Sequence, residues 1–266
     1  NGLNPVCRGK VEVCDGNGLV DVTHADPQTL RRIRQTRVAM VFQQFGLLPW
    51  RTVRENVGLG LELSGMGKAE RRDRVDAQLK LVNLMDWAER KVGELSGGMQ
   101  QRVGLARAFA TEAPILLMDE PFSALDPLIR AKLQDELLEL QSTLKRTIVF
   151  VSHDLDEAFK LGNRIALMEG GRLVQMGTAR EIIANPVDAY VAEFVAHMNP
   201  LGVLTAEDMA EPGAAEGTPI APETPVIKVM ELLKTVPAVA LTDGRRKTRE
   251  GVIARLIDPR GTATRG

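Results

Sequence analysis

Polar side chains that could do chemistry follow three apolar runs of this sequence. Gln43 comes directly after the run VAMVF, and Asp119 and Glu120 come directly after ILLM. His153 comes shortly after the end of TIVFV. If these runs are parallel strands of one sheet, their carboxyl ends lie along a single edge, where open α/β sheets bind ligands. The sequence therefore predicts that an amide, two carboxylates and an imidazole converge there.

These groups suit phosphoryl transfer from a nucleotide to water, a reaction that depends on positioning and charge neutralisation. We expect Asp119 to hold Mg2+ through coordinated water, because Mg2+ favours carboxylates and keeps waters. Glu120 would act as general base on the attacking water. His153 would bond the γ-phosphate or that water, and Gln43 would reach the metal ion and the water from a loop that can move. Taken singly, each residue could equally be ordinary loop or surface material.

The stretch LSGGMQQR directly precedes a run of helix formers, VGLARAFA, and its LSGG part could bind an anion. Ser96 is a good N-cap, and Gly97 and Gly98 let backbone N–H groups approach a ligand closely. The positive end of the following helix favours phosphate. An ordinary capped helix is the alternative for this stretch alone.

Four apolar runs have the length and composition of strands. They are Val38–Phe42, Ile115–Met118, Thr147–Val151 and Ile165–Met168. The first three are nearly continuous, as expected of parallel strands covered on both faces. Leucines and valines between them repeat at helical spacing, at Leu133, Leu137, Leu140 and Leu144 and at Val75, Leu79 and Val82. Alternating strands and helices predict an α/β domain with a parallel sheet. After Met168, EGG followed by RLVQMG predicts a hairpin at the sheet edge.

Composition limits the class of protein. Hydrophobic residues make up 44% of the 266 residues, enough for a core, and the net charge of -1 argues against a nucleic-acid binder. Cys7 and Cys14 are the only cysteines, which indicates neither a disulfide framework nor a metal site. No apolar run approaches the ~20 residues that cross a bilayer.

The composition changes near the C-terminus. Residues 200–225 contain five prolines among acids and alanines, which predicts a linker. Residues 226–266 are too few for a confident independent core, and we interpret them as a tail.

The motifs together resemble the ATP-binding subunit of ABC transporters. LSGGMQQR resembles the signature motif, ILLMDEP resembles Walker B with the adjacent catalytic glutamate, and SALD resembles the D-loop. Gln43 resembles the Q-loop glutamine and His153 the switch histidine. The resemblance covers residues 1–199 and implies a P-loop NTPase-like (RecA-like) parallel-sheet core, with a helical signature subdomain at about 51–112.

The resemblance also implies a site and an assembly. Glu120 and His153 would be catalytic, Asp119 and Gln43 would bind Mg2+, and nucleotide contacts would come from Gln43, Ser96, Gly97, Gly98, Gln100 and Asp126. Two copies would pair head to tail, so that LSGG serves the ATP of its partner. The further partners implied are an integral membrane permease and, indirectly, a substrate-binding protein. The subunit would lie peripherally at the cytoplasmic face of the plasma membrane.

The sequence contains no GxxxxGK[ST] stretch, the phosphate loop that binds the β- and γ-phosphates. We expect the sequence to be truncated just after that loop and its helix, and this polypeptide alone to bind ATP weakly or not at all. The alternative is a non-catalytic regulatory or scaffold subunit. The coding sequence upstream of Asn1 discriminates between the two: a phosphate loop within a few dozen residues supports the ATPase, and a start codon at this point supports the scaffold.

Two further stretches indicate the solute. QQFGLLPWRTVRENVGLGLEL and FVAHMNPLGVL resemble subunits for quaternary-amine uptake, and Met99 is familiar in that branch. We expect choline, with glycine betaine or proline betaine next. VMELLKTVPAVALTDGRRKTREGVI resembles half of a regulatory CBS motif, which would suit osmotic regulation. ABC ATPases of DNA repair or translation fit less well, because the stretch between Gln43 and Leu95 leaves no room for a long coiled coil and the chain has one cassette.

Overall fold

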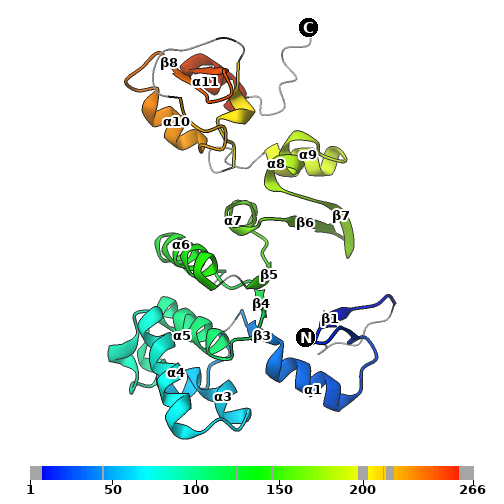
Figure 1. Ribbon diagram of the computed structural model, residues 1–266, viewed down its shortest axis with the longest axis vertical. Coiled ribbons are helices and arrows are strands. Elements are labelled where there is room, and N and C mark those ends of the chain that lie inside the picture. The colour runs from blue at the N-terminus through cyan, green and yellow to red at the C-terminus, as the bar shows by residue number, and fades with distance from the viewer. Residues whose placement is uncertain are drawn as a thin grey trace. The chain divides into compact units, whose positions relative to one another are not determined.

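The computed structural model describes residues 8–43, 45–123, 125–144, 146–196, 203–211, 213 and 219–257. The chain forms two compact units, Asn1–His153 and Asp154–Gly266. Figure 1 labels the main elements of both. Among the described residues, no helix has the length and apolar character needed to cross a membrane.

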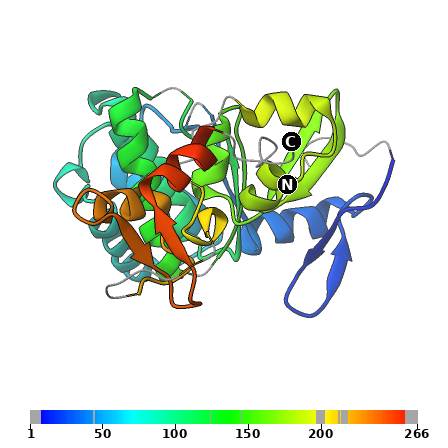
Figure 2. The same cartoon turned by 90° about the horizontal axis from the view of Figure 1, so that it is seen from above.

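The first unit contains a hairpin, a three-stranded sheet and several helices. Its strands are β1 (Glu12–Cys14), β2 (Leu19–Asp21), β3 (Val38–Val41), β4 (Ile115–Asp119) and β5 (Thr147–Val151). Its helices are α1 (Pro27–Thr36), α2 (Val53–Val57), α3 (Leu59–Leu63), α4 (Lys68–Leu81), η1 (Met85–Trp87), η2 (Val92–Glu94), α5 (Gly97–Ala110) and α6 (Pro127–Leu144). Figure 2 shows the β1–β2 hairpin in dark blue, followed by α1.

The three strands that carry the candidate residues form one parallel sheet in the order β3-β4-β5. Val41 pairs with Met118, and Asp119 pairs with Val151, so the carboxyl ends of the strands are level. The prediction of three parallel strands is confirmed, with β3 ending one residue earlier and β4 one residue later than the apolar runs. This register places the residues after each strand at one edge of the sheet.

One face of this sheet is well covered. Ala39 and Val41 of β3 and Leu116 of β4 are buried, and α5 packs against β3. Val149 and Val151 of β5 remain 53% and 57% exposed. The expectation that all three strands are covered on both faces is therefore wrong for β5 in the described residues. An apolar run shows that a strand avoids water, but it does not show which segment covers it.

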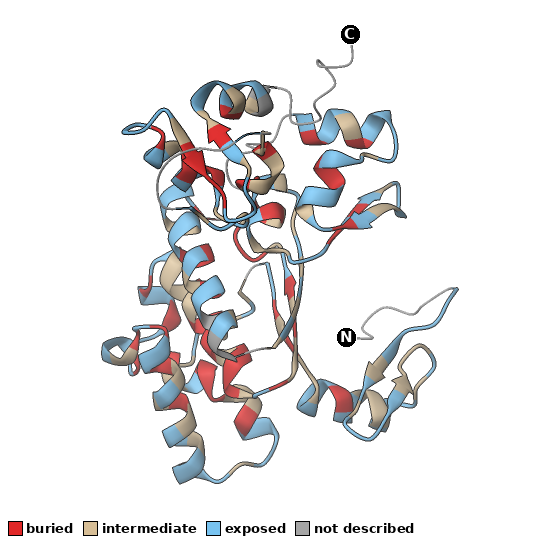
Figure 3. Ribbon diagram, turned by 45° about the horizontal axis from the view of Figure 1, so that its top comes forward, coloured by how far each residue is buried: buried red, intermediate tan, exposed pale blue. Residues whose placement is uncertain are grey.

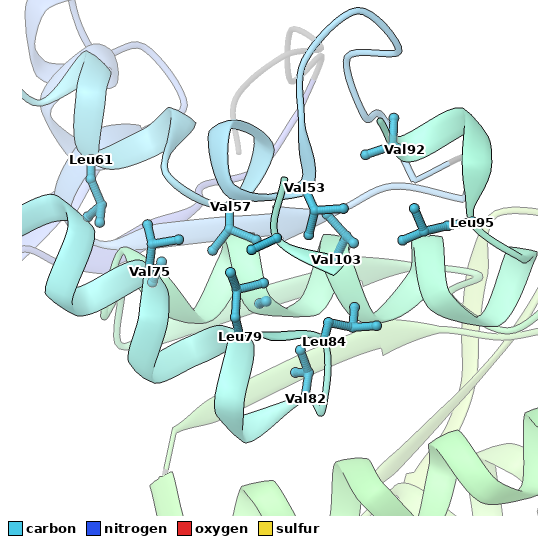
Figure 4. Close-up of a cluster of buried hydrophobic side chains, with 13 residues drawn as sticks. Val53, Val57, Leu61, Val75, Leu79, Val82, Leu84, Val92, Leu95 and Val103 are labelled. Atoms are coloured by element: carbon cyan, nitrogen blue, oxygen red, sulfur yellow. The ribbon is translucent and has the colours of Figure 1, made fainter. Parts of the chain in front are cut away.

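The helices α2, α4 and α5 enclose a separate aliphatic core within the first unit. Figure 4 shows valines and leucines from these helices and the loops between them pointing toward one another. Val57, Leu79 and Val103 are fully buried, and burial of each such side chain contributes about 1.5–3 kcal/mol. The periodicity of Val75, Leu79 and Val82 is confirmed, since all three lie in this core. Figure 3 colours the residues by burial and shows buried and exposed positions alternating along the helices.

Local sequence fixes where these helices begin and which face they bury. Thr52 caps α2 in a reciprocal capping box with Glu55, and Asp26 caps α1 before Pro27. In α6, Leu133 and Leu137 are buried as predicted. The side chains of Leu140 and Leu144 lie outside those the structure describes.

The described residues of the second unit form four strands and several helices. They are α7 (Leu155–Leu161), β6 (Ile165–Glu169), β7 (Arg172–Gly177), α8 (Ala179–Ala184), α9 (Ala189–Ala196), η4 (Glu207–Met209), α10 (Val226–Leu232), β8 (Ala238–Ala240), β9 (Arg246–Thr248) and α11 (Arg249–Ile257). The predicted hairpin is confirmed as the antiparallel pair β6–β7. Its predicted place at the edge of the parallel sheet is not, because β6 and β7 form their own two-stranded sheet. α7 separates β6 from β5 in the chain, and Gly170 and Gly171 turn β7 back onto β6.

The C-terminal segments form a small core of their own. Leu204, Ala206 and Met209 are buried together with side chains of α10, β8 and α11. Ile220 forms a parallel bridge to Leu241. The described part of 200–225 therefore differs from the linker that we expected, because its apolar residues pack against the segment that follows. The domain limits 1–199 and 226–266 stay predictions.

Candidate active site

Gln43, Glu120 and His153 meet at the carboxyl edge of the parallel sheet. The Gln43 side-chain Nε2 donates a hydrogen bond to Glu120 Oε2 at 3.0 Å. The same carboxylate oxygen lies 3.4 Å from His153 Nδ1. The three residues follow β3, β4 and β5, so the structure brings together side chains that the sequence places far apart.

The backbone of Glu120 adopts an uncommon conformation. Its φ of 41° lies in the left-handed region, which residues with a β-carbon rarely adopt. The Glu120 N–H donates to Val151 O at 3.0 Å, and the Ser123 hydroxyl donates to Glu120 O at 3.1 Å. These contacts hold the carboxylate at the sheet edge at a local energetic cost, and such strain is common at functional sites.

The acidic and imidazole side chains at the sheet edge are exposed to solvent to different degrees. The side chain of Glu120 is 29% exposed and that of His153 is 70% exposed. Asp119 is exposed at the last position of β4, directly before Glu120. Among the described residues, no cluster of three or more His, Cys, Asp or Glu side chains could hold a metal ion. Mg2+ commonly takes only one or two protein carboxylates, with phosphates and waters completing its shell, so Asp119 fits that chemistry.

The glycine turn at the start of α5 packs against the start of α6. Ser96 caps α5 by accepting a hydrogen bond from the Met99 N–H at 3.4 Å. A β-carbon on Gly98 would lie 2.7 Å from Ile129 Cγ2, so only glycine fits at this approach. A β-carbon on Gly97 would lie 3.8 Å from Leu125 Cδ2, which is an ordinary van der Waals distance. The turn is thus supported by apolar side chains in and directly before α6.

Gln100 and Asp126 have local roles in this structure. Gln100 Nε2 donates to Leu95 O at 3.1 Å, within its own helix start. Asp126 caps α6 by accepting from the N–H groups of Leu128 and Ile129 at 3.1 and 3.0 Å. Gln100 follows the glycine turn by two residues, and Asp126 follows Leu125, which lies near Gly97. Their roles toward a nucleotide stay predictions.

Two polar residues that the sequence analysis did not single out hold the loop after Gln43. Arg107 of α5 donates to Gly46 O at 2.6 Å and to Phe45 O at 2.8 Å. Burial lowers the pKa of the Arg107 guanidinium from its ordinary value. Asn56 of α2 is fully buried and bonds the backbone of Leu48 and Thr52. Arg107 is an arginine inside the apolar run VGLARAFA, and this unusual placement is the sequence signal that could have pointed to it.

Comparisons with known proteins place this geometry in a family. Residues 8–123 match the ABC transporter family. The chain is 49% identical over 210 residues to the glycine betaine/proline betaine transport system ATP-binding protein of Escherichia coli, covering 79% of this chain and 52% of that protein. It is 44% identical over 232 residues to the trimethylamine N-oxide transport system ATP-binding protein of Ruegeria pomeroyi, covering 87% of this chain and 67% of that protein. The chain thus spans about half the length of the first of these relatives.

A solved structure shows the same fold. A dimeric ATP-binding cassette in a post-hydrolysis state, bound to ADP and Pi, superposes with a TM-score of 0.58 and 35% sequence identity. The match covers 66% of this chain and 76% of that one. The parallel sheet with its attached helices is therefore the α/β core of an ABC cassette, and the chain belongs to the ABC transporter family of ATP-binding proteins.

Proposed function

We propose that this protein binds and hydrolyses ATP to power a membrane importer of quaternary amines. The observation that carries the proposal is the meeting of Gln43, Glu120 and His153 at one sheet edge. The names of the relatives support the transport role, since each is the ATP-binding protein of a transport system for a methylated amine.

In the proposed reaction, Glu120 takes a proton from the attacking water. The oxygen of that water forms a bond to the γ-phosphorus while the bond to the β-phosphate oxygen breaks, and ADP leaves. His153 and Gln43, which both contact the Glu120 carboxylate, orient it and donate to the water or the γ-phosphate. Mg2+, when bound through Asp119 and Gln43, would neutralise the phosphate charge.

The second proposed role belongs to the start of α5. Ser96, Gly97 and Gly98 present a capped helix N-terminus that is supported from the α6 side. A helix N-terminus favours phosphate. We place the ATP of a second copy of this subunit against it, together with Gln100 and Asp126. A solved relative of this fold is a dimer, which supports a homodimeric assembly.

The proposed partners are an integral permease and, indirectly, a substrate-binding protein. Trp50 and Leu63, both 68% exposed on the helical part, offer an apolar surface on which a permease could dock. The subunit would lie peripherally at the cytoplasmic face of the membrane. For the solute we propose choline, with glycine betaine or proline betaine next. The relatives named above, which are betaine and amine-oxide systems, support this class of solute.

The second candidate function is a non-catalytic scaffold or regulatory subunit of such a transporter. The observation that favours it is the lack of a GxxxxGK[ST] stretch in this sequence. A scaffold would bind the permease but would not bind or hydrolyse ATP.

Reconstitution of the protein as encoded with its permease in vesicles tests both functions. We expect ATP-dependent uptake of labelled choline or betaine that Glu120→Gln abolishes. Uptake without any ATP hydrolysis by this subunit would favour the scaffold. A system that hydrolyses ATP but moves none of the quaternary amines would refute the solute class alone.

A further inference from the structure

Arg107 links α5 to the loop that carries Gln43. The residue lies in the third turn of α5, the helix that begins at Gly97. Its two terminal nitrogens donate to consecutive carbonyls, Phe45 O at 2.8 Å and Gly46 O at 2.6 Å. A guanidinium presents its donors in a rigid planar fork, so a pair of neighbouring acceptors is a site that lysine cannot match.

The position of these carbonyls matters because they follow Gln43 closely. Phe45 has a φ of 59°, and its N–H donates to Phe42 O at 2.9 Å, which closes a tight turn across Gln43. A bulky residue at such a φ is strained and is held by its surroundings. The guanidinium supplies a contact on the α5 side of this turn.

The packing of α5 against the turn is close. A β-carbon on Gly104, one helical turn before Arg107, would lie 3.9 Å from both Phe45 O and Val41 Cγ1. Gly104 is buried. Gly104 and Arg107 therefore lie on the same face of α5, and together they seat the turn on the helix.

The charge of Arg107 serves no ion pair among the described residues. It is partly buried, and desolvation lowers the pKa of its guanidinium, although an arginine stays protonated at any physiological pH. Holding a desolvated cation against two backbone carbonyls costs free energy that a neutral residue would not. The two hydrogen bonds to Phe45 O and Gly46 O offset that cost.

We infer that Arg107 is a positioning residue that couples α5 to Gln43, so that a displacement of the helix opened by Ser96 shifts the Gln43 amide against Glu120. The inference rests on the proposed ATPase function. It gives one subunit a path from the helix start to the Glu120 carboxylate of the same chain, through Arg107, the Phe45 turn and Gln43.

A second buried polar residue, Asn56, anchors a different part of the same loop. Asn56 holds Leu48 O at 3.1 Å and Thr52 O at 2.9 Å, and so fixes the far part of the loop to α2. The carbonyls of Phe45 and Gly46 lie between Gln43 and that anchor. Loss of Arg107 should therefore loosen the Gln43 end of the loop and leave the Asn56 end in place.

The first test is a double-mutant cycle on the hydrolysis rate of the full protein. We expect Arg107→Met to lower kcat by up to about a hundredfold, as misplacement of a catalytic group does, with little change in KM for ATP. Arg107→Lys, which can keep one of the two bonds, should fall between. In a Gln43→Ala background the Arg107→Met change should have almost no further effect. A full multiplicative loss in that background would overturn the inference, because Arg107 would then act independently of Gln43.

The second test needs no ATP. Hydrogen exchange of the segment 45–48 should become faster in Arg107→Met, while the segment 52–57 held by Asn56 keeps its protection. Arg74→Met is the matched control, since Arg74 pairs only with the acids Glu70 and Glu112 among the described residues. Unchanged exchange at 45–48 would overturn the inference even if hydrolysis fell. If the wild-type protein hydrolysed no ATP, the proposed function would fail and the exchange result would still decide whether Arg107 holds the turn.

Discussion

The sheet edge and the start of α5 differ in how they present chemistry. At the sheet edge, the side chains of Gln43 and His153 meet at one carboxylate oxygen of Glu120, and the three residues follow three different strands. At the start of α5, the chemistry belongs to the backbone and one capping hydroxyl, and the support comes from Leu125 and Ile129. The first region can lose a functional group without disturbing the fold. In the second region, the proposed phosphate contacts and the packing involve the same residues.

The difference teaches that substitutions in the two regions should separate in their effects. A change at the sheet edge should alter the rate of hydrolysis and leave stability almost unchanged. A change at the start of α5 should alter both. Four predictions test that separation, in decreasing order of expected effect.

Glu120→Gln should give the largest effect. Removal of the general base should lower turnover by about 10²–10⁴-fold, while ATP binding and Tm stay near the wild-type values. Phosphate release and calorimetry measure the two quantities. Glu12→Gln, which changes an exposed acid paired with Lys10, is the control. Hydrolysis at the normal rate by Glu120→Gln would show that the base has been wrongly assigned.

His153→Ala should give a smaller loss. A hydrogen bond to a charged group contributes about 1.5–3 kcal/mol, which corresponds to about a ten- to hundredfold lower rate. Stability should not change, because the imidazole is 70% exposed. His24→Ala, at another exposed histidine, is the control. A large drop in Tm for His153→Ala would contradict the separation drawn here.

Gly98→Ala should lower both stability and turnover. The new methyl group would meet Ile129 Cγ2 at 2.7 Å, and overpacking of this kind costs about 1–3 kcal/mol. In Gly97→Ala the contact to Leu125 Cδ2 at 3.8 Å is ordinary, so stability should hold or rise by up to about 1 kcal/mol. Urea denaturation of the two variants provides the comparison. Equal stabilities would mean that α6 does not constrain the glycine turn.

Ser96→Ala should give the smallest change of the four. Loss of an N-cap costs about 1 kcal/mol, and Ser96→Asp should restore most of it because aspartate is an equally good cap. Thermal denaturation measures both variants. If alanine and aspartate gave the same Tm, the hydroxyl would not be capping α5.

Much of the sheet edge could be predicted from the sequence. Apolar runs of β-branched and aliphatic residues gave β3, β4 and β5 to within one residue, and parallel geometry then put Gln43, Glu120 and His153 together. Helical spacing likewise predicted the burial of Val75 and Leu79. These features depend on patterns of side-chain type, which a sequence displays directly.

Other features could not be predicted because they depend on backbone atoms or on distant packing. The acceptors of Arg107 are carbonyls, which carry no residue signature. The prolines of 200–225 favoured the prediction of a linker, whereas Leu204 and Met209 of this range pack into the C-terminal core. The exposure of Val149 depends on which segment lies over β5, and an apolar run does not identify that segment.

The left-handed backbone of Glu120 sets stability against activity at a single position. Such a conformation costs roughly 1–2 kcal/mol for most residues, and glycine or asparagine adopts it more easily. Replacement by either residue would relax the chain and remove the carboxylate at once. On the proposed assignment of Glu120 as general base, the more relaxed version of this sheet edge would be inactive, and screens that reward thermostability alone would select against ATP hydrolysis.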